Sequence, residues 1–282
     1  MRKWLLFLVL IGGMYVYFSR VEVTQITIKD DEIPSAFDGF KIVQLTDLHN
    51  KVYGKNNEML LREITKQSPD IVVMTGDMVS TLDKSTAPFL HIAEQIAKTY
   101  DTYYIVGNHE QAMPLAARTQ LVTDLKKLGI TVLDNEHTKI KRKQQEITLS
   151  GMWFNLRYYR DISQDNDTLP YHFSLDTMQE VMGEPIHEEG YHILLTHNPV
   201  YFETYASFGY DLTLAGHMHG GMIRIPFVGG VVSPERDWFP LYDAGLYQHQ
   251  DKQMYVSRGL GSGTLKLRLF NRPEMTTLIL QK

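Results

Sequence analysis

The sequence contains no cysteine, which excludes disulfide bonds and thiolate metal sites. Because disulfide-free proteins occur on both sides of a membrane, this absence leaves the redox compartment open. The chain also has no surplus of basic residues, since 28 Lys and Arg stand against 33 Asp and Glu, a formal net charge of −5. Nothing in this balance indicates nucleic acid as a partner. Any metal ion must therefore be held by His, Asp, Glu or Asn side chains.

Residues 1–20 differ from the rest of the chain, because an uncharged and mostly apolar run covers residues 4–18. The run is short for a membrane-spanning helix of about 20 residues and has the length of a signal-peptide core, but no convincing A-x-A cleavage site follows it. Trp4, Tyr15 and Tyr17 lie at its two ends, where interfacial aromatic residues are expected. We therefore expect residues 1–20 to form an uncleaved membrane anchor.

The charges that flank this run suggest its orientation. Arg2 and Lys3 favour an N-terminus inside the cell, although Arg20 partly opposes them. We expect a protein of the cell membrane with a single-pass anchor, whose remaining residues, 21–282, form one domain outside the cytoplasm. The length of 282 residues is sufficient for a domain with a substantial core.

Apolar runs that end in polar residues alternate with segments of helical periodicity in the first half of the chain. Strands separated by helices predict a largely parallel sheet covered by helices, in which the loops after the strand C-termini build the site. The predicted strands cover residues 21–28, 41–49, 70–77, 102–110 and 130–133, and the helices lie near residues 56–68, 85–99 and 115–129.

From about residue 138 the pattern changes to a hairpin of antiparallel strands, which begins a second layer. Two further segments, residues 152–173 and 226–252, are expected to be long irregular loops with a functional role. The remaining predicted elements are strands over 191–199, 210–221, 253–261 and 274–282, with a short helix near 199–207.

Polar residues follow five of the predicted strands. One at a time they have ordinary explanations: an Asp after a strand is usually a helix N-cap, and the histidines of "LAGHMHGG" are commonly a solvated strand end. If strand geometry persists that far, His217 and His219 point the same way and converge on one point. Five strands that deliver such residues to one sheet edge indicate a shared site, made of Asp47, His49, Asp77, Asn108, His109, His197, His217 and His219.

The chemistry of this set suits a metal centre. Carboxylates, an amide oxygen and neutral imidazoles without thiolate favour Mn²⁺, Fe or Zn²⁺. The set offers more ligands than one such ion needs. Two ions about 3.5–4 Å apart that share a bridging carboxylate would use them, and such a site clamps the attacking and leaving oxygens of an in-line phosphoryl displacement.

The motifs DLH (47–49), GD (76–77), GNHE (107–110), TH (196–197) and GHMH (216–219) occur along the chain in this order. They resemble the calcineurin-like metallophosphoesterases, whose pattern is DxH, GD, GNH, H and GHxH. The resemblance covers about residues 40–282. Its extended stretches are similar to a subgroup of membrane-associated bacterial phosphoesterases, some of them related to UDP-2,3-diacylglucosamine pyrophosphatases.

The resemblance implies an α/β fold, a four-layer αββα sandwich of two mixed sheets flanked by helices. It also implies a metal-dependent phosphoric ester hydrolase with two divalent ions, Mn²⁺ as first choice and Fe or Zn as alternatives. A metal-bound hydroxide would attack phosphorus, while His109 stabilises the developing charge or protonates the leaving oxygen. One ion would be held by Asp47, His49 and His219, the other by Asn108, His197 and His217, and Asp77 would bridge them.

Two features depart from the family pattern. Members often carry an acid three residues after the GD aspartate, where this chain has Ser80, so the group that orients His109 is left open between Asp83 and Glu110. Met218 stands between the two ligand histidines, where relatives often have Thr, and we expect it to pack in the core.

The sequence constrains the substrate less than the reaction. The aromatic segments 152–161 and 235–247 suggest a lipid-linked or amphiphilic phosphate as the substrate. If these aromatics only pack the long loops, they do not favour it over another phosphorylated small molecule. Arg224 and Arg258, near motif glycines, are candidate phosphate contacts, because guanidinium binds phosphate bidentately. The alternative function is a catalytically silent scaffold of the same fold that binds a partner, and the complete ligand set disfavours it. The oligomeric state is not indicated.

Overall fold

The computed structural model describes residues 20–159, 173–187, 189–221, 223–234, 238–262, 268 and 270–282. The predicted membrane anchor, residues 1–20, lies outside these residues except for Arg20. Within the described ranges, no helix combines the length and the apolar character that a membrane crossing requires. Much of the predicted irregular segment 152–173 also lies outside the described residues.

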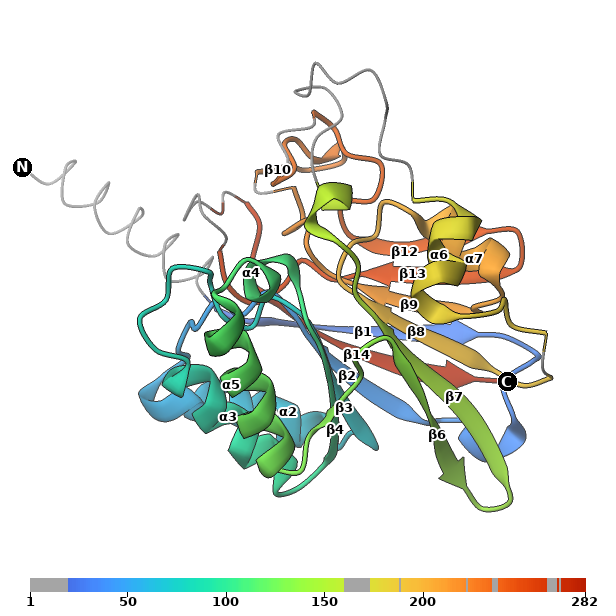
Figure 1. Ribbon diagram of the computed structural model, residues 1–282, viewed down its shortest axis with the longest axis horizontal. Helices are drawn as coiled ribbons and strands as arrows, with labels where there is room; N and C mark the ends of the chain where they lie inside the picture. Colours follow the sequence, from blue (N-terminus) through green and yellow to red (C-terminus); the bar gives the residue numbers. More distant parts are fainter. Residues whose placement is uncertain are drawn as a thin grey trace, which may run out of the picture.

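The first of two six-stranded sheets has the spatial order β1, β14, β2, β3, β4, β5 (Figure 1). All neighbouring strands in it are parallel except β14 and β2, which confirms the predicted, largely parallel sheet. The strands are β1 (Glu22–Lys29), β14 (Glu274–Gln281), β2 (Lys41–Leu45), β3 (Ile71–Thr75), β4 (Asp101–Ile105) and β5 (Thr131–Val132).

The second sheet has the order β12, β13, β9, β8, β7, β6, with antiparallel pairs at its two edges and parallel pairs between them. The predicted hairpin beyond residue 138 is β6 and β7. The strands are β12 (Gly245–His249), β13 (Lys252–Val256), β9 (Leu212–Ala215), β8 (His192–Thr196), β7 (Gln145–Met152) and β6 (Glu136–Arg142).

Helices cover the outer face of each sheet. On one side lie α2 (Glu58–Gln67), α3 (Ala87–Ala97) and α5 (Leu115–Lys127), and on the other lie α6 (Leu175–Met182) and α7 (Phe202–Phe208) (Figure 1). Short helical turns lie in the connections between these elements: η1 (Ser35–Phe37), η2 (Lys55–Asn57), α4 (Asn108–Gln111) and η3 (Leu156–Tyr159). A two-stranded hairpin, β10 (Arg224–Ile225) and β11 (Gly229–Gly230), lies apart from both sheets.

Three layers of apolar packing hold this arrangement together. Leu60, Ile92 and Leu125 pack the first helices onto the outer face of the first sheet. Alternate residues of the strands, such as Val73 and Leu195, form the core between the sheets. Tyr205 and Phe208 of α7 pack with Met178 of α6 against the second sheet. Helix, sheet, sheet and helix follow in that order, which is the predicted four-layer αββα arrangement.

Three strands were not predicted from the sequence. β11 and β12 lie within the predicted irregular segment 226–252, and β10 lies just before it. Residues of β12 alternate between half-buried and exposed, and its pairing with β13 across a tight turn defines it as a strand. Helix α6 was also missed, although Ser174 caps it by accepting a hydrogen bond from the Thr177 amide at 3.2 Å.

Candidate metal centre

The predicted site residues all follow the carboxyl ends of strands. Asp47, Asp77 and Asn108 come two or three residues after β2, β3 and β4 of the first sheet. His197 directly follows β8, and His217 follows β9 by two residues, both in the second sheet. The carboxyl ends of strands from both sheets therefore lie close together, and the site lies where the two sheets meet.

The strand alternation expected for His217 and His219 is wrong, because β9 ends at Ala215. Both histidines have a left-handed backbone, with φ of 70° and 49°, in a tight turn where the Met218 amide donates to the Gly216 carbonyl at 2.8 Å. The same unusual conformation occurs at Asp47, His49 and Asp77. Left-handed non-glycine residues are costly and gather at functional sites, so this clustering supports a functional role. Met218 is buried, as expected.

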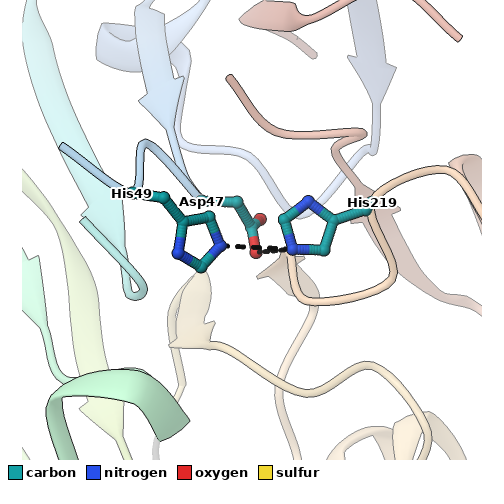
Figure 2. A group of neighbouring side chains, drawn as sticks. All are labelled: Asp47, His49 and His219. Atoms are coloured by element: carbon teal, nitrogen blue, oxygen red, sulfur yellow. Dashed lines mark hydrogen bonds and ion pairs between the residues drawn. The ribbon is translucent and has the colours of Figure 1, made fainter. Parts of the chain in front are cut away.

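The first group of converging side chains is Asp47, His49 and His219 (Figure 2). His49 Nε2 lies 3.3 Å from His219 Nε2, which in turn lies 3.4 Å from Asp47 Oδ1. The three ligand atoms lie within 4.8 Å of one another, a spacing that one metal ion can bridge.

A second group consists of Asp77, His197 and His217, all buried. His197 Nε2 lies 3.1 Å from Asp77 Oδ2 and 3.7 Å from Asp47 Oδ1 of the first group. A third group contains His49, Asp77 and His109, so Asp77 belongs to two groups and lies between them. This is the position that a bridging carboxylate requires.

Unsatisfied polar atoms test whether the site fits cations. Asp47 Oδ1 and Asn108 Oδ1 are buried without a hydrogen-bond partner in the described part of the chain. Burying such an atom without a partner costs about 1–3 kcal/mol, a cost that a metal ion would remove. Carboxylate, amide oxygen and imidazole form a donor set that divalent transition ions accept. The residues present therefore fit two metal ions.

The electrostatics of the cluster are consistent with cation binding. Burial lowers the pKa of His49 and, more strongly, that of His219, which keeps both imidazoles neutral and able to act as ligands. Burial also disfavours charge on His197, but Asp77 and Asp47 outweigh it and raise the pKa of His197 to about 10. Although burial opposes it, His197 holds the pKa of Asp77 well below its usual value. A metal ion must therefore displace the His197 proton.

Glu110 fastens two of the ligand loops to each other. Its fully buried carboxylate accepts hydrogen bonds from the amides of Asp77 and Gly107, both at 2.9 Å, and from those of Met78 and Val79 at 2.7 and 3.1 Å. Burial and the charge of Asp77 raise the pKa of Glu110 to about 7, against the effect of these donors. Both oxygens of the Glu110 carboxylate thus accept hydrogen bonds from backbone amides, and the side chain does not orient His109.

His109 is oriented by Thr81. The Thr81 backbone amide lies 3.2 Å from His109 Nδ1, and the Thr81 hydroxyl lies 3.1 Å from the same atom. Because a backbone N–H can only donate, Nδ1 must accept, and the neutral ring carries its proton on Nε2. Asp83 instead accepts hydrogen bonds from the Ser80 amide and the Asn50 side chain. Neither acid left open by the sequence therefore holds the ring.

Ser80, which occupies the position of the family's acid, contacts a different histidine. Its Oγ lies 3.1 Å from Nδ1 of His49. A hydrogen bond at Nδ1 fixes the orientation of the ring and leaves Nε2 free to face a metal. Neither Ser80 nor Thr81 was expected to hold a histidine: Ser80 was noted only as a departure from the family pattern, and nothing in the sequence marks Thr81.

The two predicted phosphate contacts have other partners. Arg224 Nη1 lies 2.8 Å from Asp243 Oδ2 and donates to the Gly220 carbonyl at 2.9 Å. Arg258 forms ion pairs with Glu274 at 2.9 Å and Glu22 at 3.1 Å. Arg224 thus supports the loop that follows the GHMH motif, and a phosphate contact by either arginine stays a prediction.

Arg268 is a cation at the site that the sequence analysis did not single out. Its Nη2 lies 3.3 Å from His219 Nδ1 and donates to the Arg258 carbonyl at 2.7 Å. Burial lowers its pKa to about 10. No local motif marks this arginine, because only the folded chain brings it to a histidine 49 residues away.

Comparison with known proteins agrees with this geometry. The family model described as calcineurin-like phosphoesterase matches residues 40–221. Metallophosphoesterase YkuE of Bacillus subtilis is 29% identical over 281 residues, which cover 96% of this chain and 91% of the relative. Phosphodiesterase YaeI of Escherichia coli is 30% identical over 257 residues, which cover 89% and 83%.

A solved structure, a candidate 5′-nucleotidase of Staphylococcus aureus in complex with α-ketoglutarate, shares the fold. Its TM-score is 0.51 at 13% identity, and the match covers 78% of this chain and 49% of that chain. This chain thus spans about half the length of that structure.

Proposed function

The chain belongs to the calcineurin-like phosphoesterase family and is a metal-dependent phosphoester hydrolase, and from that premise we propose a two-metal enzyme that cleaves a phosphoester or pyrophosphate bond of a substrate near a membrane. The observation that carries the proposal is the position of Asp77, which belongs to two groups of converging His and Asp side chains.

In this proposal, Asp47, His49 and His219 hold one ion, Asn108, His197 and His217 hold the other, and Asp77 joins them. Two bound divalent ions, with Mn²⁺ as first choice, would supply an activated water and neutralise the charge on the transferred phosphoryl group. We expect the ions to satisfy the buried oxygen atoms of Asp47 and Asn108 that have no hydrogen-bond partner.

His109 is the residue that we expect to act on the substrate itself. Its protonated Nε2 is available to the site because the Thr81 amide occupies Nδ1. The ring lies beside His49, with centroids 4.7 Å apart, so its proton is close to the metal ligands. From there Nε2–H can stabilise charge on a phosphoryl oxygen or protonate the leaving oxygen.

An amphiphilic or lipid-linked phosphate is the substrate class that we favour. Support comes from the apolar run over residues 4–18 and from the aromatic segment around Trp238, which is exposed and does not simply pack a loop. A domain outside the cytoplasm, attached to the cell membrane, stays part of the proposal. A silent scaffold of the same fold would explain neither the oriented His109 nor the complete ligand set.

Activity of the full-length protein in detergent tests the proposal. The protein is stripped of metal, resupplied with Mn²⁺, and assayed on bis-p-nitrophenyl phosphate, p-nitrophenyl phosphate and a lipid pyrophosphate. We expect hydrolysis of at least one of them, dependent on Mn²⁺. Two bound ions per chain without hydrolysis of any substrate would favour the scaffold.

Two variants test the assignment of roles. We expect His109→Ala to retain both ions and to lose about 10²–10⁴-fold in rate, the usual contribution of a positioned acid or base. Asp77→Asn should lose metal. The exposed His91→Ala on α3 serves as a control that should match the wild type. Metal loss in His109→Ala, together with full occupancy in Asp77→Asn, would show that the roles are wrongly assigned.

A further inference from the structure

An exposed apolar surface lies beside the metal centre. It consists of Ile225, Phe227, Val228, Trp238, Phe239 and Leu241, which we call the hairpin surface. Trp238, Phe239 and Leu241 are 72%, 60% and 74% exposed, and Phe227 at the turn between β10 and β11 is completely exposed. Single exposed apolar residues are ordinary, but a contiguous set with two Phe and a Trp marks an interaction site.

Backbone hydrogen bonds join the segment with Trp238 and Phe239 to the hairpin. The Val231 amide donates to the Ile223 carbonyl at 2.9 Å, and the Phe239 amide donates to the Val231 carbonyl at 2.8 Å. Val232 also pairs with Trp238 in an antiparallel bridge. The segment around Trp238 therefore extends the hairpin, and the aromatic side chains belong to the same small structure.

The hairpin is attached to the metal-binding loop. Arg224, in β10, donates to the carbonyl of Gly220, the residue after His219, and pairs with Asp243. The Gly230 amide in β11 donates to the same Asp243 carboxylate at 2.5 Å. Whatever binds the hairpin surface is therefore held beside the metal centre.

The hairpin also lies near the point where the chain enters its apolar N-terminal run. Phe270, 47% exposed, lines a cavity of about 390 Å³ together with residues 224–229. Two residues later, Arg272 donates from its guanidinium to the carbonyls of Arg20 and Val21, both at 3.4 Å. The uncharged run over residues 4–18 ends just before Arg20. In Figure 1, β10 lies at the outer end of the molecule, away from both layers of helices.

We propose that the hairpin surface inserts into the surface of a lipid bilayer. The six residues carry no charge, and the whole chain has a net charge of −5, so apolar burial rather than attraction to anionic lipids would drive the contact. Trp, Phe and Leu are the side chains that favour the membrane interface. The nearby apolar run favours a bilayer over a protein partner, because it would hold this face of the domain close to the lipid.

The proposal deepens the proposed function, since it places the metal centre at the bilayer surface, where a lipid-linked phosphate presents its head group. It requires no conformational change, because the hydrogen bonds of Arg224 and Asp243 already hold the hairpin in place. It can be tested without any measurement of hydrolysis.

The three tryptophans of the chain provide the test. In full-length protein with Trp4→Phe and Trp153→Phe, the remaining fluorescence comes from Trp238. The protein is reconstituted with phosphatidylcholine vesicles, with and without brominated acyl chains, which quench tryptophan only on contact. We expect Trp238 to lose most of its fluorescence in brominated vesicles and to shift to shorter wavelength.

Trp153 provides the matched control. It is half-buried beside Arg118 of α5, with the guanidinium 5.4 Å from its ring centroid, and it donates to Asp134. Protein with Trp4→Phe and Trp238→Phe should therefore keep its fluorescence in the same vesicles. Vesicle association with Trp238 unquenched, or no association at all, would overturn the proposal. So would shielding of Trp238 without lipid in a dimer detected by sedimentation.

Substitution of the surface links the inference to the substrate. We expect Phe227→Asp with Leu241→Asp to reduce hydrolysis of a vesicle-embedded phosphodiester by about 10-fold or more, because several large side chains lose their favourable transfer to lipid. Hydrolysis of soluble bis-p-nitrophenyl phosphate should not change. If neither the soluble nor the vesicle-embedded ester is ever cleaved, the proposed function fails while the quenching result stands. Equal vesicle activity of variant and wild type would contradict the bilayer contact.

Discussion

A methyl group added at Gly107 should disable the metal centre, although the local backbone conformation accepts alanine. Gly107 has φ −92° and ψ −176°, an extended conformation that alanine adopts freely. A Cβ at this position, however, would lie 2.3 Å from Asp77 Oδ1 and 2.4 Å from the Asp77 amide nitrogen, where an ordinary contact is 3.4 Å or more. The Asp77 carboxylate and its backbone amide must therefore move away from Gly107 by about 1 Å.

The size of the effect follows from metal geometry. Metal–oxygen distances are about 2.0–2.2 Å, so a bridging carboxylate displaced by about 1 Å cannot remain bound to both ions. Asp77 also accepts a hydrogen bond from the His109 amide at 2.8 Å, so its movement would disturb His109 as well. A misplacement of about 1 Å costs roughly 10²-fold in rate. We expect Gly107→Ala to lose at least that factor and to bind fewer than two ions per chain.

The assay combines kcat on bis-p-nitrophenyl phosphate with metal content by elemental analysis and with thermal unfolding. Gly129→Ala is the control, since its Cβ meets no atom within 4 Å but its φ of +84° imposes strain. That variant should lose about 1–2 kcal/mol of stability and keep its rate. If Gly107→Ala retained two ions and the wild-type kcat, the close packing of Gly107 on Asp77 could not be what positions the bridge.

Three further outcomes follow from the site. In protein stripped of metal, the folded state holds the pKa of His197 at about 10, against 6.5 in the unfolded chain, so the stability that its charge contributes is complete below pH 6.5 and is lost as the pH rises towards 10. The melting temperature should therefore fall between pH 6.5 and 10, and His197→Ala should abolish this fall. Glu110→Gln would turn an NH₂ group towards two of the four backbone amides that now donate to the carboxylate, either those of Met78 and Val79 or those of Asp77 and Gly107. Hydrogen exchange of that pair of amides should accelerate, and unchanged protection of all four would show that Glu110 does not hold the two loops together. Ser80→Ala removes the contact to His49 Nδ1 and should weaken Mn²⁺ binding about 10-fold or more by titration calorimetry, whereas unaltered affinity would show that Ser80 does not orient this ligand.

Much of the fold could be predicted because its elements carry local signals. β3 is buried throughout its length between two covered faces, and such strands are continuous apolar runs. The helices over the first sheet show helical periodicity because each packs one apolar face onto that sheet. By contrast, β12 and the β10–β11 hairpin consist of partly exposed residues whose strand character depends on pairing, and neither could be identified from residue pattern.

The sequence alone determined the composition of the site. Asp, Asn and His after five predicted strands define the ligand chemistry without knowledge of any distance, whereas the strands belong to two sheets, and only the fold brings their ends together. The same reasoning failed for the geometry of His217 and His219, because strand alternation applies only while the strand continues, and β9 ends at Ala215.

Only the tertiary structure decided how these residues are held. Thr81, Ser80 and Arg268 act on histidines through contacts between segments up to 49 residues apart, and no local pattern encodes such contacts. The protonated nitrogen of His109 likewise follows from the direction of one backbone N–H. Residue types determine what chemistry a site can perform, whereas orientation, protonation and the exposure of the hairpin surface arise from packing of distant segments, which exists only in the folded chain.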